Sequence, residues 1–167
     1  MLVRKGEMKD LPLLKSMFRR IVDDMDRRGI AIWDDYYPFE FLEEDIRKGE
    51  LYLAEDDDVI ISSFTLTDSF EGCGDIAWKT PDASALYIDR FGVDVAFQHK
   101  GIASLMLSKA KELALSKAES LRLFVVDCNT PAIRLYEKSG FERCDGYYDL
   151  HVDENIILRE FGFEFSI

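Results

Sequence analysis

Residues 93 to 110 read "VDVAFQHKGIASLMLSKA" and contain the transition on which the fold depends. The first residues end an apolar run that begins at Ala85, has no helical period and is typical of a central strand. From Gly101 the apolar residues, among them Ile102 and Met106, recur at helical spacing and predict a helix over residues 101–117. A strand therefore leads into a helix through a tight corner that contains lysine and glycine.

The residues after this helix predict a second buried strand. Residues 121–126, "LRLFVV", form a continuous apolar run, as expected for a strand that is covered on both faces. The strand–helix–strand unit from Ala85 to Val126 is therefore expected to be a right-handed parallel crossover. Thr130 and Pro131 then fit the N-cap and first position of another helix, which stops at Gly140.

The rest of the chain predicts a mixed α/β fold. The elements expected there are helices over 10–29 and 38–49, a hairpin of strands 51–54 and 59–66, a loop over 67–84, two antiparallel strands over 141–150 and 156–165, and a further strand over 2–4. We expect one domain over residues 1–167, with a mostly antiparallel sheet, one parallel crossover and flanking helices.

Composition narrows the class of protein. The chain has 167 residues, a net charge of -12 and three cysteines, none in a C-x-x-C motif, so neither structural zinc nor a disulfide framework is expected. We expect no metal site and a reduced, cytoplasmic protein. No signal peptide is visible and no apolar run approaches ~18 residues, so no membrane span is expected either.

The charges are unevenly distributed. Residues 34–58 include eleven acids and two bases, whereas residues 98–138 include seven bases and four acids. A protein this acidic should repel nucleic acid, while its basic segment could still hold a small anion. The same two runs are equally consistent with solvated faces that maintain solubility.

The corner at Gly101 has the features of an anion-binding helix start. The first helical N–H groups have no partner within the helix and carry its positive dipole end, and the first turn contains no acid. Gly101 and Ala103 allow close approach, while Lys100 and Ser104 add charge and a hydroxyl donor. Neither a P-loop nor a G-x-G-x-x-G fingerprint is present.

Two segments resemble the GNAT superfamily of N-acetyltransferases. "FGVDVAFQHKGIASLML" (91–107) is similar to the family's acetyl-coenzyme A pyrophosphate motif, and "RLFVVDCNTPAIRLYEKSGFER" (122–143) is similar to its second conserved block. The two departures are Val95, where many relatives have proline, and Ala103, where many have a second glycine. The resemblance implies a GNAT-like fold and acetyl-CoA as co-substrate.

The resemblance also implies roles for individual residues. The strand from Phe91 to Val95 would pair with the pantetheine arm, the next corner would hold the pyrophosphate, and Asn129 and Tyr136 would lie near the pantetheine and the thioester sulfur. The cofactor-binding set is Phe91, Gly92, Val93, Val95, Gln98, His99, Lys100, Gly101, Ile102, Ala103, Ser104, Asn129, Ala132, Tyr136 and Lys138.

The expected reaction is direct attack of a neutral amine on the acetyl thioester. A backbone N–H near Val93 would stabilise the oxyanion, and Tyr136 would protonate the leaving thiolate, unless it is only a core aromatic. The amine must first lose a proton, either to Asp89 or through water. His99 and His151 have no partners at triad or metal spacing, and Cys128 is expected to be buried and inert.

The acceptor is less well defined by the sequence. Trp33, Tyr36 and Tyr37 lie in an irregular segment between helices and either line the acceptor pocket or fill the core. Tyr87, which shares a strand face with Asp89, is also expected to bind the acceptor. The acceptor would be a primary amine of a small molecule or a protein. A non-catalytic CoA-binding sensor and a structural domain with a vacant cleft are the alternatives, and a homodimer is left open.

Overall fold

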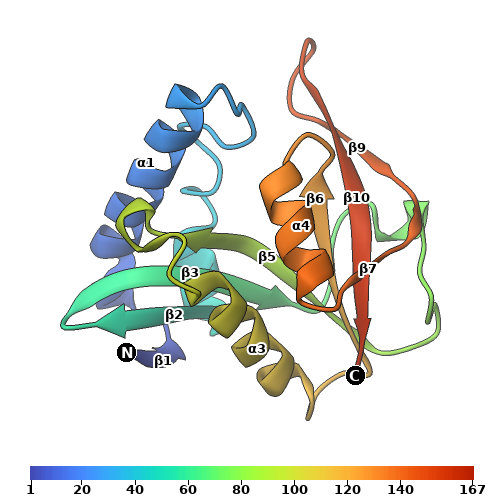
Figure 1. Cartoon of the computed structure of the whole chain (residues 1–167), viewed down its shortest axis with the longest axis horizontal. Coiled ribbons are helices and arrows are strands. Elements are labelled where there is room, and N and C mark those ends of the chain that lie inside the picture. The colour runs from blue at the N-terminus through green and yellow to red at the C-terminus, as the bar shows by residue number, and fades with distance from the viewer. The chain divides into compact units, whose positions relative to one another are not determined.

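The computed structural model describes residues 1–167 and divides into two compact units, each built from separate stretches of the chain. Unit 1 comprises Met1–Leu66 and Arg90–Met106, and unit 2 comprises Thr67–Asp89 and Leu107–Ile167. Strand β5 (Ala85–Val93) and helix α3 (Ile102–Ala114) contribute residues to both units. Figure 1 shows all the elements in chain order by colour.

Unit 1 is built on antiparallel strands. Strand β2 (Leu51–Asp56) pairs with β1 (Leu2–Lys5) on one side and with β3 (Val59–Thr67) on the other. The strand order is β1-β2-β3-β5, so the end of β5 lies beside β3. The strand expected over residues 2–4 and the hairpin of β2 and β3 are confirmed.

Two helices cover the core of unit 1. Helix α1 (Leu11–Arg27) follows a short 3-10 helix, η1 (Met8–Asp10), and helix α2 (Leu42–Lys48) precedes β2. Full burial of a side chain such as Phe18 contributes on the order of 2 kcal/mol. The buried residues of this core are Leu14, Met17, Phe18, Ile21, Leu42, Ile46, Leu51, Leu53 and Ile60.

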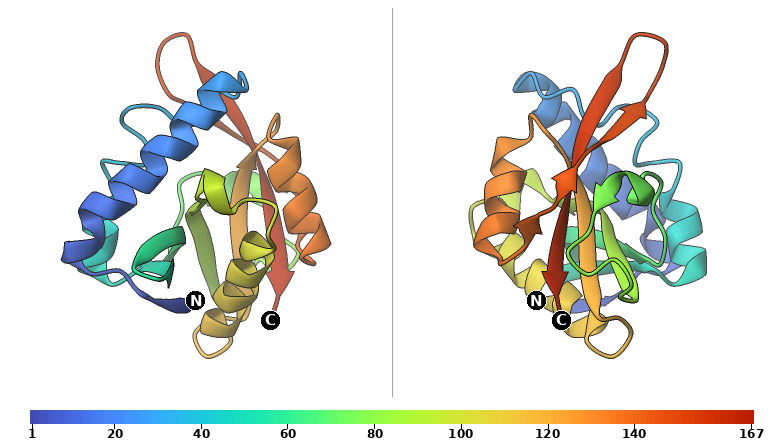
Figure 2. Two further views of the ribbon diagram at one scale, coloured as in Figure 1. Left: turned by 60° about the vertical axis from the view of Figure 1, so that its left-hand side comes forward. Right: turned by 90° about the vertical axis from the view of Figure 1, so that its right-hand side faces the viewer.

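Unit 2 contains the parallel strand pair expected from the sequence. Strand β5 runs parallel to β6 (Ser120–Val126), in a register from Ala85↔Ser120 to Ile88↔Leu123. Strand β10 (Ile157–Ser166) is antiparallel to β6 and also pairs with β7 (Glu142–Arg143) and β9 (Tyr148–His151). Figure 2 shows the hairpin of β9 and β10. The fold class, a mixed α/β protein with mainly antiparallel strands and one parallel pair, is confirmed.

The single strand expected over residues 141–150 is wrong. The segment instead forms β7, then β8 (Asp145–Gly146), which pairs with β4 (Ile76–Ala77), and then β9. Gly146 has φ +93°, and a Cβ at this position would lie 2.4 Å from the backbone oxygen of Asp75. The chain therefore leaves β10 at this glycine and approaches a segment that the sequence predicted to be a loop, which also contains η2 (Cys73–Asp75).

Most helix limits lie close to the expected ones. Helix α4 (Thr130–Lys138) begins one residue earlier than expected, because its N-cap is Asn129 and not Thr130. Helix α3 begins one residue after Gly101. The helix expected over 38–49 is shorter than predicted: α2 begins at Leu42 and ends at Lys48. None of the helices combines the length and the apolar character that a membrane span requires.

Candidate active site

The corner between β5 and α3 in unit 1 has an irregular backbone. A short 3-10 helix, η3 (Val95–Phe97), is followed by His99 with φ +59° and Gly101 with φ +80°. The Asp94 carboxylate caps η3 by accepting a hydrogen bond from the Ala96 N–H at 3.0 Å, and it also accepts one from Arg20 Nε at 3.0 Å. The carboxylate nearest to the corner is therefore already bound.

The start of α3 is open to an anion. The hydrogen bond from Leu105 N to Gly101 O (3.1 Å) is the first one of the helical turn, so the N–H groups of Ile102 to Ser104 precede the helical pattern. The first turn contains no acid, and a Cβ on Gly101 would meet nothing within 4 Å. Positive dipole, free space and the absence of a carboxylate make this corner suitable for a phosphate group.

Two polar side chains of the corner bind its own backbone. Lys100 donates from Nζ to the Ala96 carbonyl at 2.9 Å, and Gln98 donates from Nε2 to the Val93 carbonyl at 3.3 Å. His99 is exposed. The donors best placed for an anion are therefore backbone N–H groups.

The end of β5 is oriented by contacts with α1 and β3. The Ser62 hydroxyl donates to the Gly92 carbonyl at 2.7 Å, and the Asp94 N–H donates to the Ile61 carbonyl at 2.9 Å. Because backbone groups alternate between strand edges, those of Phe91 and Val93 face the edge opposite β3. A Cβ on Gly92 would lie 3.0 Å from atoms of Phe18 and Ile21, so glycine allows α1 to approach the strand closely.

Helix α4 in unit 2 positions the second group of expected site residues. The Asn129 side-chain oxygen caps this helix by accepting a hydrogen bond from the Ala132 N–H at 3.4 Å, which orients the amide so that its NH₂ group is the donor offered to a ligand. Lys138 is exposed at the other end of the helix. Cys128 is exposed, so the expectation that it is buried is wrong: it lies in the turn that follows β6.

Tyr136 projects from α4 into an aromatic environment. The residue is 8% exposed, and its ring centroid lies 6.1 Å from that of Phe141 and 6.5 Å from that of Phe163. Burial, together with the negative charge of Asp89, raises the pKa of the Tyr136 phenol well above its usual value. The phenol is therefore fully protonated at neutral pH, as a proton donor must be.

The structure adds Glu160, which the sequence analysis missed. Glu160 lies in β10 opposite Val126 of β6 and Tyr148 of β9. Burial, with a smaller effect of the Asp89 charge, raises the pKa of Glu160 to about 7. The only available sequence signal was that Glu160 shares one face of an alternating strand with Glu164.

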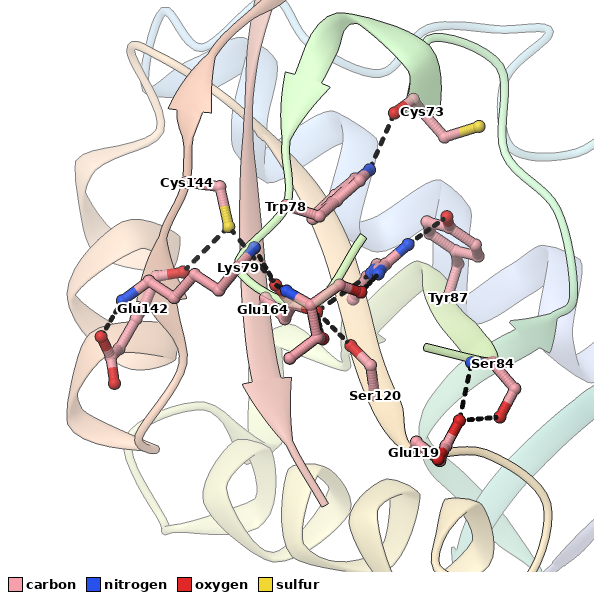
Figure 3. A network of polar contacts seen from close by, with 12 residues as sticks. Cys73, Trp78, Lys79, Ser84, Tyr87, Glu119, Ser120, Glu142, Cys144 and Glu164 are labelled. Carbon is pink, nitrogen blue, oxygen red and sulfur yellow. Dashed lines mark hydrogen bonds and ion pairs between the residues drawn. The ribbon is translucent and has the colours of Figure 1, made fainter. Parts of the chain in front are cut away.

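Glu164 is bound by a network within unit 2. Its carboxylate accepts hydrogen bonds from Ser120 Oγ at 2.6 Å and Lys79 N at 2.6 Å, from the Thr80 hydroxyl, and from Arg122 Nε at 3.3 Å (Figure 3). Burial alone would raise the pKa of Glu164, but these hydrogen bonds outweigh it and hold the pKa at about 2. The network attaches residues 79 and 80 to the sheet.

The aromatic residues expected at an acceptor pocket lie in different environments. Trp33 is 5.5 Å from the Phe18 ring and 6.2 Å from Tyr37, so it packs against the core of unit 1, whereas Tyr36 is 74% exposed. In unit 2, Tyr87 is 5% exposed, and its hydroxyl accepts a hydrogen bond from Arg122 at 3.2 Å. No group of His, Cys, Asp and Glu side chains is arranged to hold a metal ion.

A comparison with protein-family models shows which family the chain belongs to. The model of the acetyltransferase (GNAT) family matches residues 17–141, which include the corner at Gly101, Asn129 and Tyr136. The chain belongs to the GNAT family. Membership in this acetyltransferase family indicates an acyltransferase.

Solved GNAT structures share the fold at low sequence identity. A GNAT acetyltransferase from Streptococcus agalactiae 2603 has 17% identity and a TM-score of 0.85, with 99% of this chain and 95% of that chain covered. One from Listeria monocytogenes 4b F2365 has 17% identity, a TM-score of 0.76 and coverage of 99% and 94%. A ribosomal-protein-alanine N-acetyltransferase from Brucella melitensis has 19% identity, a TM-score of 0.69 and full coverage of both chains, 100% each. None of the curated proteins matches the chain.

Proposed function

We propose that this GNAT protein transfers the acetyl group of acetyl-CoA to a primary amine of a small molecule or a protein. The observation that carries the proposal is the start of α3, where N–H groups that precede the helical pattern follow an open, left-handed glycine and no acid occupies the first turn. This arrangement fits a diphosphate, because backbone donors and the helix dipole favour negative charge. Ile102, Ala103 and Ser104 would hold the pyrophosphate, and bound acetyl-CoA would supply the reactive thioester.

The chain would contribute a proton donor and an oxyanion donor to this reaction. The amine nitrogen forms a bond to the acetyl carbon, the carbon–sulfur bond breaks, and the products are an amide and a free thiol. We propose that a backbone N–H near Val93 stabilises the oxyanion and that the Tyr136 hydroxyl gives its proton to the thiolate. The proton that the amine nitrogen loses as the amide forms reprotonates Tyr136 through solvent. The raised pKa of Tyr136 opposes this transfer unless the thiolate is also desolvated, which raises the pKa of the thiol as well.

The proton of the incoming ammonium needs an acceptor. Asp89 and Glu160 are the carboxylates whose charges interact in unit 2, and the pKa of Glu160, about 7, suits a group that takes up a proton near neutral pH. We propose Glu160 as the acceptor, with burial and, to a smaller extent, the like charge of Asp89 raising its pKa. A water molecule that passes the proton to either carboxylate is compatible with this assignment.

The binding step is tested by placing a carboxylate at the helix start. Ser104→Glu puts a negative charge in the first turn of α3, where the helix dipole tolerates it, while Ser108→Glu puts the same charge one turn further along, also on an exposed residue. We expect the Kd of acetyl-CoA, measured by calorimetry, to rise at least about tenfold in Ser104→Glu only, the equivalent of one close like-charge contact. Equal affinity in the two variants would contradict the proposed phosphate site.

The transfer step is tested with a panel of amines and a thiol-release assay. Release of CoA that depends on the amine supports an N-acetyltransferase. Binding of CoA without thioester consumption across the panel would instead support a sensor that binds CoA, and no binding at all would leave a structural domain.

A further inference from the structure

Arg90, near the end of strand β5, has an unusual backbone conformation. Its φ is +47°, in the left-handed region, although it lies inside β5 and is not a glycine. A side chain at such φ values is disfavoured because its Cβ approaches the carbonyl oxygen. Such a conformation persists only where the surrounding structure holds it.

A buried ion pair fixes the Arg90 side chain. The guanidinium binds the Asp45 carboxylate at two points, Nε to Oδ2 at 2.6 Å and Nη2 to Oδ1 at 2.9 Å, and the two residues are 9% and 5% exposed. The Thr65 hydroxyl also donates to Asp45, at 2.9 Å, and the guanidinium carbon lies 5.1 Å from the centre of the Phe41 ring. The Arg90 side chain is thus held by Asp45 of α2 and by Phe41, which precedes α2, while Thr65 of β3 holds Asp45.

The left-handed residue controls the direction of the backbone that follows it. A residue in this conformation within a strand changes which groups face which edge, as in a β-bulge. Two residues further on, the Gly92 carbonyl is bound by Ser62 on β3, which leaves the N–H groups of Phe91 and Val93 at the other edge. The proposed function uses one of these N–H groups to stabilise the oxyanion.

We propose that Arg90 and Asp45 are positioning residues for acetyl transfer. Their ion pair holds Arg90 in the left-handed conformation, and this conformation directs the N–H groups of Phe91 and Val93 toward the thioester oxygen. The inference rests on the proposed function, because these N–H groups stabilise an oxyanion only if the chain transfers an acetyl group. Neither Arg90 nor Asp45 touches the reacting atoms in this assignment.

Two double variants separate the backbone conformation from the ion pair. Asp45→Asn/Arg90→Gly and Asp45→Asn/Arg90→Ala both remove the charge pair without leaving a buried charge, and the asparagine amide that replaces the carboxylate can still accept the hydrogen bond from Thr65. They differ only by a Cβ at residue 90, which glycine omits at no cost in the left-handed region. We expect kcat to be at least about tenfold higher in the glycine variant, with the same KM for acetyl-CoA, because alignment at the thioester affects the transition state.

A control pair uses a left-handed residue away from β5. Asp58 has φ +63° and lies in the exposed turn between β2 and β3. Asp58→Gly and Asp58→Ala differ by the same Cβ, and we expect their kcat values to be equal. A difference of the same size at residue 58 would mean that the effect at residue 90 reports general stability, and it would overturn the assignment.

The outcomes distinguish this inference from the proposed function. If the wild-type chain binds acetyl-CoA and acetylates an amine but the two Arg90 double variants have equal kcat, the positioning role is wrong and the proposed function stands. If the wild-type chain does not bind acetyl-CoA, the proposed function fails, and the positioning role fails with it. Should the alanine variant not fold while the glycine variant does, the amide NMR shifts of Phe91 and Val93 on addition of acetyl-CoA decide: shifts in the glycine variant as in the wild type support the role, and their absence overturns it.

Discussion

The two units differ in the kind of chemical group that they offer to a reaction. In unit 1 the candidate groups are backbone N–H donors, and the nearby buried carboxylates of Asp94 and Asp45 are bound to arginines. In unit 2 the candidate groups are side chains whose pKa values are shifted by burial, above all Tyr136 and Glu160. Under the proposed function, we expect substitutions in unit 1 to change binding or alignment and substitutions in unit 2 to change proton transfer.

The largest effect is expected for Tyr136→Phe. Removing a general acid lowers kcat by about 10²-fold to 10³-fold, while the Kd of acetyl-CoA should stay within about twofold because no binding donor of unit 1 is touched. Steady-state kinetics and calorimetry on the same preparation measure both quantities. Wild-type turnover would exclude Tyr136 from the mechanism. A parallel loss of affinity for acetyl-CoA would contradict the expectation that substitutions in unit 2 affect only proton transfer.

The next largest effect is expected on stability, from Glu164→Gln. This change leaves the charge of Arg122 without its partner in a site where both side chains are at most 5% exposed, which costs about 3 kcal/mol of unfolding free energy. Urea denaturation measures the loss. Glu119→Gln is the control: Glu119 also accepts a backbone N–H, that of Ser84 at 3.1 Å, but it is exposed, and we expect less than about 1 kcal/mol there.

Glu160 and Glu164 share one face of β10, yet their pKa values move in opposite directions. The pKa of Glu164 is lowered to about 2, so its stabilising contribution is present above pH 4.5 and lost as the pH falls from there toward 2. The pKa of Glu160 is raised to about 7, so its ionisation destabilises the fold as the pH rises from 4.5 through 7.

Glu160→Gln tests this contrast with a smaller effect. At pH 8 the variant should be more stable than the wild type by about 1 kcal/mol, a value reduced for partial exposure, and at pH 4 the two should be equal. The same variant should lose the acid limb of the pH–rate profile near pH 7, if Glu160 accepts the proton of the amine. If the variant keeps this limb, Glu160 is not the proton acceptor, and Asp89 or water takes the proton of the amine.

The smallest effect is expected at an exposed ion pair in unit 1. Arg47 and Glu43 lie one turn apart on α2, with N–O at 2.7 Å and side chains that are 63% and 50% exposed. Glu43→Gln should lower the unfolding free energy by only about 0.4 kcal/mol, and the loss should vanish in high salt. If Glu43→Gln lowered the unfolding free energy as much as Glu164→Gln, burial would not explain why one ion pair stabilises the protein more than the other.

The sequence predicted the elements that depend on local patterns. The parallel crossover followed from two apolar strands around an amphipathic helix, and α4 from Thr130 and Pro131 at its start. The absence of an acidic residue from the first turn of α3, after Gly101, was also predictable, because it is visible in the sequence itself. These features involve residues that are close in the chain.

The features that were missed depend on contacts between distant residues. The break at Gly146 arises from close approach to Asp75, and the pKa of Glu160 arises from burial and from Asp89. The left-handed conformation of Arg90 interrupts the regular alternation of side chains along β5, which no sequence pattern indicates. No periodic pattern shows that an arginine within a strand is held by Asp45.

The interleaving of the two units along the chain has a practical consequence. Residues 67–89 belong to unit 2 but lie between the two stretches of unit 1. No single truncation point therefore yields either unit by itself. A chain that ends at residue 106 keeps all of unit 1 but carries residues 67–89 of unit 2 with it, and a split between residues 89 and 90 divides both units. Ribosomal synthesis must likewise release residues 90–106 before the first unit is complete, when part of the second has already emerged.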